Sequence, residues 1–355
     1  MILADLIPAD FYGLRSSPML LLISGGAIVL LAFGADRAVG SAVRLARAMG
    51  MSTVIIGATV VSLGTTSPEA FVSVTAAFRG EPGLALGNGV GSMICDTALI
   101  FGLCCCIARL PKERFILNRH GWLQLGAGVL LSAIVAGLAV AAGGIVGVTI
   151  PRWVGVGLVV LLGGYLWVSV RWARQHPSMA VAEVQAVGGE APAKAPLLGS
   201  LVLLAFGLGL VMVGSNLLVE SAAELARRFG VPPSVLAVTL VAFGTSLPEL
   251  VTAIASILKG HPELLVGNVI GADILNVLFV IGASATAVPL GVPVEFFYLH
   301  LPVMLIALTM LRLAIFARGD HFRRWHGVPL LMLFAGYYAA LLMLARLGYL
   351  TIEGA

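Results

Sequence analysis

Charged residues are scarce in this chain. Asp, Glu, Lys and Arg make up 11% of its 355 residues, whereas a soluble globular domain carries about 25%. Hydrophobic residues make up 59%, and the mean hydropathy is +1.05. This composition excludes a soluble globular protein and indicates a membrane protein. The small basic excess, a net charge of +4, is concentrated on one side of the predicted membrane, so we expect no nucleic-acid partner.

Side chains suited to enzyme chemistry are also few. The cysteines, Cys95, Cys104, Cys105 and Cys106, lie in one apolar stretch without metal-ligand spacing, so we expect neither a disulfide framework nor a zinc site. All histidines lie at or near the ends of apolar segments, and no HExxH, GxGD or Ser-His pattern occurs. An intramembrane hydrolase is therefore disfavoured, and we predict that the chain is not an enzyme. Residues 1–17 lack a basic n-region, so no secretory signal is predicted.

Long apolar segments, in contrast, fill most of the chain. Ten segments reach roughly the 20 residues that a membrane-spanning helix needs, near 18–47, 53–78, 83–108, 122–142, 154–170, 197–227, 234–258, 263–287, 295–317 and 328–347. We predict an all-α membrane protein of ten transmembrane helices, built from two five-helix repeats, 18–170 and 197–347. A cytoplasmic linker, 171–195, joins them. Because five is odd, the second repeat enters the membrane from the opposite side, which gives an inverted topology.

One segment occurs twice, 180 residues apart. The copy at 64–96 reads GTTSPEAFVSVTAAFRGEPGLALGNGVGSMICD, and the copy at 244–276 reads GTSLPELVTAIASILKGHPELLVGNVIGADILN. The two align without a gap, and the same offset extends to Gly34/Gly214 and Gly102/Gly282. Such a match indicates an internal duplication. Each copy holds a glutamate, Glu69 or Glu249, inside apolar sequence, and a charge at membrane depth marks a functional site.

The repeated segment is rich in oxygen atoms suited to a cation. Its proline interrupts helical hydrogen bonding, and backbone carbonyls freed around Ser62, Thr65, Ala242 and Thr245 can face a cavity. Hydroxyls come from Thr65, Thr66, Thr245 and Ser246, and carboxylates from Glu69 and Glu249. Ser92 and Asp96 stand about one helical turn apart, so both can point at the same centre. Hard oxygen ligands suit Ca²⁺ or Na⁺ rather than a soft transition metal.

These motifs resemble the paired repeats of the sodium/calcium exchanger family, part of the cation/calcium antiporter superfamily. The Gly-Thr-Ser-x-Pro-Glu sequence and the following Gly-Asn stretch carry the resemblance, which covers all ten predicted spans. It implies four central helices, alternating access and exchange of Na⁺ for Ca²⁺, without a cofactor. By position, the metal ligands that it implies are Ser62, Thr65, Thr66, Glu69, Ser92, Asp96, Ala242 (through its carbonyl), Thr245, Ser246, Glu249 and Asn276.

Three positions depart from the family's pattern. Ala272 lacks a hydroxyl that relatives supply, while Met93 and Asp273 stand where relatives typically carry an amide. We expect Asp273, Asn88 and Asn268 to lie behind the ligands, with Asp273 also a candidate proton site. A proton- or potassium-coupled divalent cation antiporter is therefore the alternative to sodium coupling.

Basic residues indicate how the chain lies in the membrane. With the N-terminus outside, fourteen Lys and Arg residues lie at cytoplasmic helix ends and six at outer ends, which is the positive-inside bias. We therefore predict both termini outside, in a prokaryotic inner or plasma membrane. Ca²⁺ and Na⁺ are the expected substrates, the lipid bilayer the surroundings, and a monomer the functional unit. Inverted repeats with broken helices favour a carrier over a channel, and we expect the first and sixth spans to slide and gate access.

Overall fold

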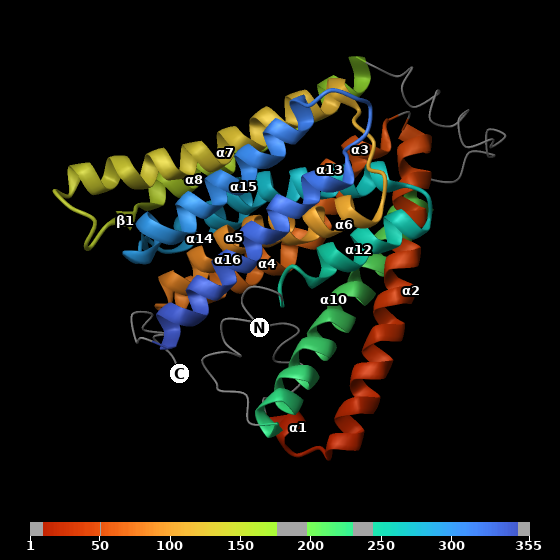
Figure 1. The fold of residues 1–355 in the computed structure, drawn as a ribbon, viewed down its shortest axis with the longest axis horizontal. Coiled ribbons are helices and arrows are strands. Elements are labelled where there is room, and N and C mark those ends of the chain that lie inside the picture. Colours follow the sequence, from red (N-terminus) through yellow and green to blue (C-terminus); the bar gives the residue numbers. More distant parts are fainter. Residues whose placement is uncertain (1–9, 50, 176–196, 230–243, 347–355) are drawn as a thin grey trace.

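The computed structural model describes residues 10–49, 51–175, 197–229 and 244–346. In these ranges the chain is almost entirely helical (Figure 1). Nine helical segments are long and apolar enough to span a bilayer, and a shorter apolar helix, α12 (Leu247–Leu258), covers the second part of the predicted seventh span. The first part of that span, which contains Ala242, and the predicted linker lie outside the described residues.

Each half of the chain contributes its own run of elements. The first contains α1 (Asp10–Gly13), α2 (Ser17–Met49), α3 (Thr53–Ile56), η1 (Gly57–Val61), α4 (Ser62–Phe78), α5 (Pro82–Ile94), η2 (Cys95–Phe101), α6 (Gly102–Ile107), α7 (Arg114–Ala141), β1 (Thr149–Ile150) and α8 (Arg152–Gln175). The second contains α10 (Leu197–Arg228), α12, α13 (Pro262–Leu275), η3 (Asn276–Ile281), α14 (Gly282–Ala287), β2 (Leu290–Gly291), η4 (Phe296–His300), α15 (Leu301–Phe316), η5 (Arg324–His326) and α16 (Gly327–Arg346). The segments η1 to η4 are π-helical turns that continue the α-helices beside them.

The two halves correspond at the same 180-residue offset as the sequence motifs. Helices α4 and α12 end at Phe78 and Leu258, and α5 and α13 begin at Pro82 and Pro262. Between them the chain turns at Gly80 and Gly260, whose φ angles of 77° and 76° only glycine adopts readily. Proline then opens each following helix at a position where no backbone donor is needed. The duplicated sequence thus forms a duplicated structure.

Equivalent helices run in opposite directions. At the end of α10, Arg228 donates to the Ser17 hydroxyl at the start of α2 (3.2 Å), so these two helices are antiparallel. Helix α13 begins where α3 begins, because the Thr53 hydroxyl donates to Glu263 (3.2 Å). Its counterpart α5 begins at the opposite end, where Pro82 lies against β2. This antiparallel arrangement is that of an inverted repeat, and the predicted all-α fold is confirmed.

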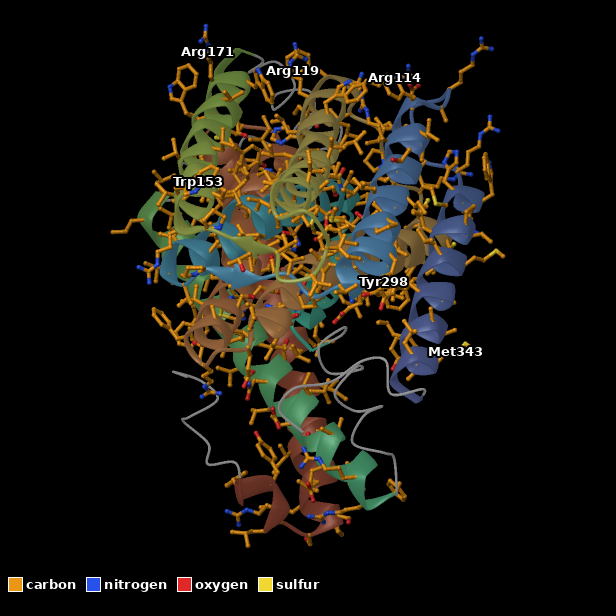
Figure 2. The ribbon with its side chains drawn as sticks, turned by 90° about the vertical axis from the view of Figure 1, so that its left-hand side faces the viewer. Arg114, Arg119, Trp153, Arg171, Tyr298 and Met343 are labelled. Atoms are coloured by element: carbon orange, nitrogen blue, oxygen red, sulfur yellow. The ribbon has the colours of Figure 1, made fainter. Side chains whose placement is uncertain are left out.

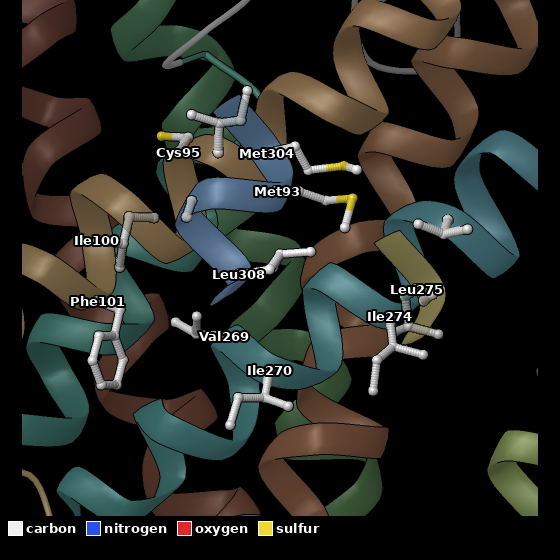
Figure 3. Packing of buried hydrophobic residues seen from close by; sticks show 14 of the residues in the cluster. Met93, Cys95, Ile100, Phe101, Val269, Ile270, Ile274, Leu275, Met304 and Leu308 are labelled. Atoms are coloured by element: carbon white, nitrogen blue, oxygen red, sulfur yellow. The ribbon is translucent and has the colours of Figure 1, made fainter. Parts of the chain in front are cut away.

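Helix α13 lies at the centre of the bundle and is buried along almost its whole length. Figure 3 shows its apolar side chains, among them Val269, Ile270 and Ile274, in the main hydrophobic core. On the side facing α3 and η1, glycine lets the backbones meet: a Cβ at Gly267 would collide with the carbonyl oxygen of Val54. Such close crossing is typical of small residues between membrane helices.

Helices α2 and α10 form a long pair at one side of the bundle (Figure 1). They contain 33 and 32 residues, about 50 Å at 1.5 Å per residue, which exceeds the roughly 30 Å of a hydrocarbon core. Their seam is narrow, since a Cβ at Gly34 would lie 2.8 Å from the carbonyl oxygen of Gly207. The pair packs on α12 through a small apolar cluster, separate from the main core, built on Leu31, Ala35 and Val211.

The loops fall at two opposite ends. Figure 2 shows Arg114, Arg119 and Arg171 together at one end, which we call the basic end. Aromatic rings support these cations there, with the Arg119 guanidinium 3.5 Å from the ring centroid of Phe115. Such a belt of aromatic and basic side chains is typical of a membrane interface. At the other end, β1 and β2 pair as a short antiparallel ladder.

Candidate functional site

The two predicted glutamates lie inside the bundle. Glu69 on α4 and Glu249 on α12 each have 1% of their surface exposed. No ion pair between described residues involves either carboxylate. A buried carboxylate without a positive partner strongly destabilises a fold, so both indicate a place where a cation binds.

Many oxygen atoms near the glutamates make no hydrogen bond. Within the described residues these buried, unpartnered atoms include both carboxylate oxygens of Glu69 and Asp96, Oε2 of Glu249, Oγ1 of Thr66, Oγ of Ser246 and Oδ1 of Asn276. Buried polar atoms are almost always hydrogen-bonded, and a concentration of exceptions requires an explanation. All of them are hard oxygens of the kind that bind Na⁺ and Ca²⁺.

Hydrogen bonds between the halves hold the two motifs together. The hydroxyls of Ser92 on α5 and Thr245, just before α12, lie 3.3 Å apart. The Thr65 hydroxyl on α4 approaches Oδ1 of Asn268 on α13 at 3.5 Å. Residues that are about 150 and 200 positions apart in the chain therefore meet, and the candidate site lies between the two repeats.

Three carboxylates share this region and repel one another. Glu69 interacts with both Glu249 and Asp96, and Asp96 interacts with Glu249. The hydroxyls of Thr65 and Thr66, from the first half, face the carboxylate of Glu249 in the second. In the described part of the chain, no three Asp, Glu, His or Cys side chains converge enough to hold a metal ion by themselves. A cation here would depend on hydroxyl, amide and backbone oxygens as well.

The polar groups behind the glutamates tie neighbouring helices together. The Asn88 amide on α5 donates to the carbonyl oxygen of Glu69 (3.0 Å) and to the Ser73 hydroxyl (2.9 Å), both on α4. The hydroxyl of Ser62 donates to the carbonyl of Thr59 (3.2 Å), and the carbonyl of Ser62 accepts from the Thr65 hydroxyl (3.3 Å). Asn88 also keeps an unpartnered Oδ1.

The expected helix break differs between the halves. Helix α4 runs through Pro68 without interruption, and the irregular π turn η1 precedes it. Pro68 interrupts the helical hydrogen bonding as predicted, but by one backbone donor alone, which frees the carbonyl of Gly64 without breaking the helix. In the second half, α12 begins at Leu247, with a turn at 244–246 before it. A second irregularity lies at Asp96 and Asn276, which occupy the π turns η2 and η3, features often found at functional sites.

Two residues of this region escaped the sequence analysis. Thr97 and Gln124 both donate to Oδ2 of Asp273, Gln124 at 2.5 Å. Asp273 is fully buried, and its other oxygen, Oδ1, makes no hydrogen bond. The one available signal was Gln124 itself, a lone amide in the apolar span 122–142.

Both halves of the chain match a known protein family. The model of the sodium/calcium exchanger protein family matches residues 19–171 and 199–343, which are the two halves. The inner membrane protein YrbG of Escherichia coli is 33% identical over 337 residues, covering 94% of this chain and 98% of its own. The putative antiporter CaxA of Alkalimonas amylolytica is 32% identical over 317 residues, covering 87% and 94%.

Solved structures agree in fold. The sodium-calcium exchanger NCX_Mj, soaked with 2.5 mM Na⁺ and 10 mM Sr²⁺, matches with a TM-score of 0.74 at 28% identity, covering 91% of this chain and 99% of its own. The same exchanger without Na⁺ and Ca²⁺ gives a TM-score of 0.72. With both halves matched by one family model and relatives above 30% identity over most of its length, this chain belongs to the sodium/calcium exchanger protein family, which comprises membrane antiporters and not enzymes.

Proposed function

We propose that this chain exchanges Na⁺ for Ca²⁺ across its membrane by alternating access. The observation that carries the proposal is the set of buried, unpartnered oxygens around Glu69, Glu249 and Asp96, between two inverted halves. Carboxylates that repel one another in an apolar bundle require cations. Family membership and the relatives' names point to the same pair of ions.

The ligands that we propose are those at the meeting of the two motifs. They are the side chains of Glu69, Glu249, Asp96, Asn276, Thr65, Thr66, Thr245, Ser246 and Ser92, together with Ser62 and the backbone carbonyl of Ala242. Asn88 and Asn268 support them from behind. The mixture of carboxylate, hydroxyl, amide and carbonyl oxygens suits Ca²⁺, which takes six to eight oxygen ligands in flexible geometry.

Exchange follows from charge balance at this site. One Ca²⁺ or several Na⁺ neutralise most of the charge on the three carboxylates, and the two loads compete for the same oxygens. The site without either load retains unpaired carboxylates, which disfavours passage of the empty carrier through the occluded state. The return step therefore requires the other ion.

Helices α2 and α10 are suited to gating. Their mutual seam has small residues. A small cluster around Leu31, Ala35 and Val211 packs the pair on α12, while Ala42 and Leu45 of α2 and Leu208 of α10 join the main core. The contact with α12 forms a cluster of its own, and it is there that the pair would slide against the bundle. We propose that this sliding exposes the site to one side of the membrane at a time.

The setting that we propose is a prokaryotic inner or plasma membrane, with the basic end in the cytoplasm and both termini outside. The relative YrbG is named as an inner membrane protein. The unit of transport is one chain, since the described halves contribute to one site from within the same molecule.

Transport by purified protein in liposomes tests the function. Vesicles loaded with Na⁺ and diluted into Na⁺-free buffer with ⁴⁵Ca²⁺ should accumulate calcium, whereas vesicles without a Na⁺ gradient should not. The same measurement with only a proton gradient, or only a potassium gradient, tests the alternative coupling. Uptake driven equally well by either, or uptake with no opposing gradient at all, would reject the sodium antiporter in favour of another antiporter or a channel.

A further inference from the structure

Asp273 is the centre of a polar cluster that joins the two halves. It lies on α13, while its hydrogen-bond donors, Thr97 and Gln124, lie on η2 and α7 of the other half. All three side chains are buried, with Asp273 and Thr97 at 0% exposure and Gln124 at 1%. Both donors approach the same oxygen, Oδ2, which fixes the carboxylate and leaves Oδ1 unpartnered.

The repeat-related cluster is entirely apolar. At the 180-residue offset, Asp273 corresponds to Met93, Thr97 to Val277 and Gln124 to Met304. These three are also fully buried, and Figure 3 shows Met93 and Met304 in the same apolar region. The structure of the bundle therefore does not demand polar groups at such positions. The polar cluster in one half has to be explained by something other than helix packing.

The register of that comparison is secured by two histidines. His120 on α7 and His300 on η4 are also 180 residues apart. Each lies within hydrogen-bonding distance of a tyrosine on the next long helix, Tyr165 at 3.4 Å and Tyr337 at 2.8 Å. Gln124 and Met304 follow these histidines by four residues, so they occupy equivalent turns.

The polar cluster lies near other carboxylates that carry negative charge when ionised. Asp96 is next in the chain to Thr97, which donates to Asp273, and the Asp96 carboxylate is repelled by both Glu249 and Asp273. Neither oxygen of Asp96, nor Oδ1 of Asp273, has a hydrogen-bond partner, and no ion pair of the described residues reaches either carboxylate. Asp96 therefore interacts both with the glutamate pair and with a fourth acid.

We propose that Asp96 and Asp273 form a lateral subsite that binds a monovalent metal ion beside the glutamate pair. Oδ1 of Asp273 and the carboxylate of Asp96 are its ligands, and Thr97 and Gln124 are positioning residues that hold Asp273 toward it. The charge favours a monovalent ion, because Asp96 is shared with the glutamates and Asp273, when ionised, adds one negative charge. The inference rests on the proposed function and extends it, since this subsite would raise the affinity for Na⁺ without being needed for Ca²⁺.

Sodium binding to purified protein tests the lateral subsite directly. With ²²Na⁺ in Ca²⁺-free buffer, Asp273→Asn should bind one ion fewer per chain than the unchanged protein. In liposomes, the Na⁺ concentration for half-maximal exchange should rise by about fivefold or more, the size of a typical coupling between neighbouring sites. The affinity for ⁴⁵Ca²⁺ without Na⁺ should change by less than about twofold. Retained Ca²⁺ binding also shows that the variant is folded.

Two further variants separate the subsite from a structural role. Thr97→Val with Gln124→Met gives the polar cluster the composition of its apolar counterpart while keeping the carboxylate, and should weaken Na⁺ binding in the same direction but less. Met93→Leu, in the apolar counterpart, should leave Na⁺ binding unchanged. Repeating the binding with ⁸⁶Rb⁺, a probe for K⁺, identifies which monovalent ion the subsite prefers.

The opposite results are equally clear. If Asp273→Asn binds as many monovalent ions as the unchanged protein and alters only the pH dependence of exchange, Asp273 carries a proton and the lateral subsite is wrong. If the unchanged protein shows no sodium-driven calcium uptake, the proposed function fails, whatever the substitution does to ²²Na⁺ binding. Loss of both Na⁺ and Ca²⁺ binding in the Asp273 variant, with normal behaviour in Met93→Leu, would make Asp273 a structural residue.

Discussion

The two halves of the molecule share their backbone arrangement but differ in where their charged residues lie. Both turn at a positive-φ glycine, both carry a buried glutamate, and both place a histidine against a tyrosine of the following helix. Alternating access needs this likeness, because the same movement must open the site toward each side in turn. The features that the two halves share are therefore those that the transport movement requires.

Their differences concentrate around the ions. The first half supplies Asp96 where the second supplies Asn276, and the second supplies Asp273 where the first supplies Met93. The two extra acids nevertheless meet in one region, because Thr97, the residue after Asp96, donates to Asp273 on α13. The site is thus asymmetric although its scaffold is symmetric, and substitutions at paired positions can separate the two properties.

The largest effect is expected at the glutamates, and it should be equal in the two halves. Glu69→Gln and Glu249→Gln should each lower calcium transport by at least about a thousandfold, ~4 kcal/mol at 1.4 kcal/mol per factor of ten. Each change removes a charge from a shared divalent site while keeping the side chain's size. Uptake of ⁴⁵Ca²⁺ in liposomes measures it, with size-exclusion chromatography as the check on folding. Near-normal exchange by either variant would remove the glutamates from the site.

A substitution at the close crossing of α13 and α3 should give the next largest effect. Gly267→Ala places a methyl group against the carbonyl oxygen of Val54, so α13 and α3 must separate, and we expect a loss of stability of about 3 kcal/mol or more. Gly126→Ala, on the exposed face of α7 with nothing near its added methyl group, is the matched control. Thermal unfolding in detergent compares the two. Equal melting temperatures would show that the crossing is looser than described.

The acid–amide pair should give a smaller and partly reversible effect. Asp96→Asn should reduce exchange by about tenfold, ~1.4 kcal/mol, because one carboxylate is lost. Adding Asn276→Asp should restore part of it, since the repeat brings both positions to the same site. Restoration should be incomplete, because Asp273 stands near one position and Met93 near the other. A folded double variant that is as inactive as Asp96→Asn would show that the two positions are not interchangeable.

Substitutions at the two ends of the bundle should have the smallest effect and should leave transport unchanged. Cysteines at Arg114 and Arg152, on a background without the native cysteines, should react with a membrane-impermeant reagent from opposite sides, Arg114 from the cytoplasm. Arg114 is preferable to its neighbour Lys112, which is 5% exposed and donates to the carbonyl of Ala317 at 3.1 Å. Labelling of both from the same side would break the ten-helix topology.

Sequence reasoning reached the periodic and repeated features of this molecule. The spans, the duplication and the glutamates follow from local composition and a fixed offset. Most described helices begin and end close to the predicted bounds, but α7 begins at Arg114, well before the predicted start at 122. Features created by contacts between residues far apart in the chain could not be predicted from the sequence. The Gln124–Asp273 hydrogen bond joins residues 149 positions apart, and the burial of Lys112 depends on the loop after α15. Nor did sequence reasoning place the π turn η1 just before α4, which continues through Pro68.

The π turns η2 and η3 also bear on the history of the chain. A π turn contains one residue more than an α turn, and one added residue rotates the rest of a helix by about 100°. η2 begins at Cys95 and η3 at Asn276, within one residue of repeat-related positions. The irregularity thus recurs at the same place in both halves, as expected if a five-helix segment that already contained it was duplicated, while the charges around it differ between the halves.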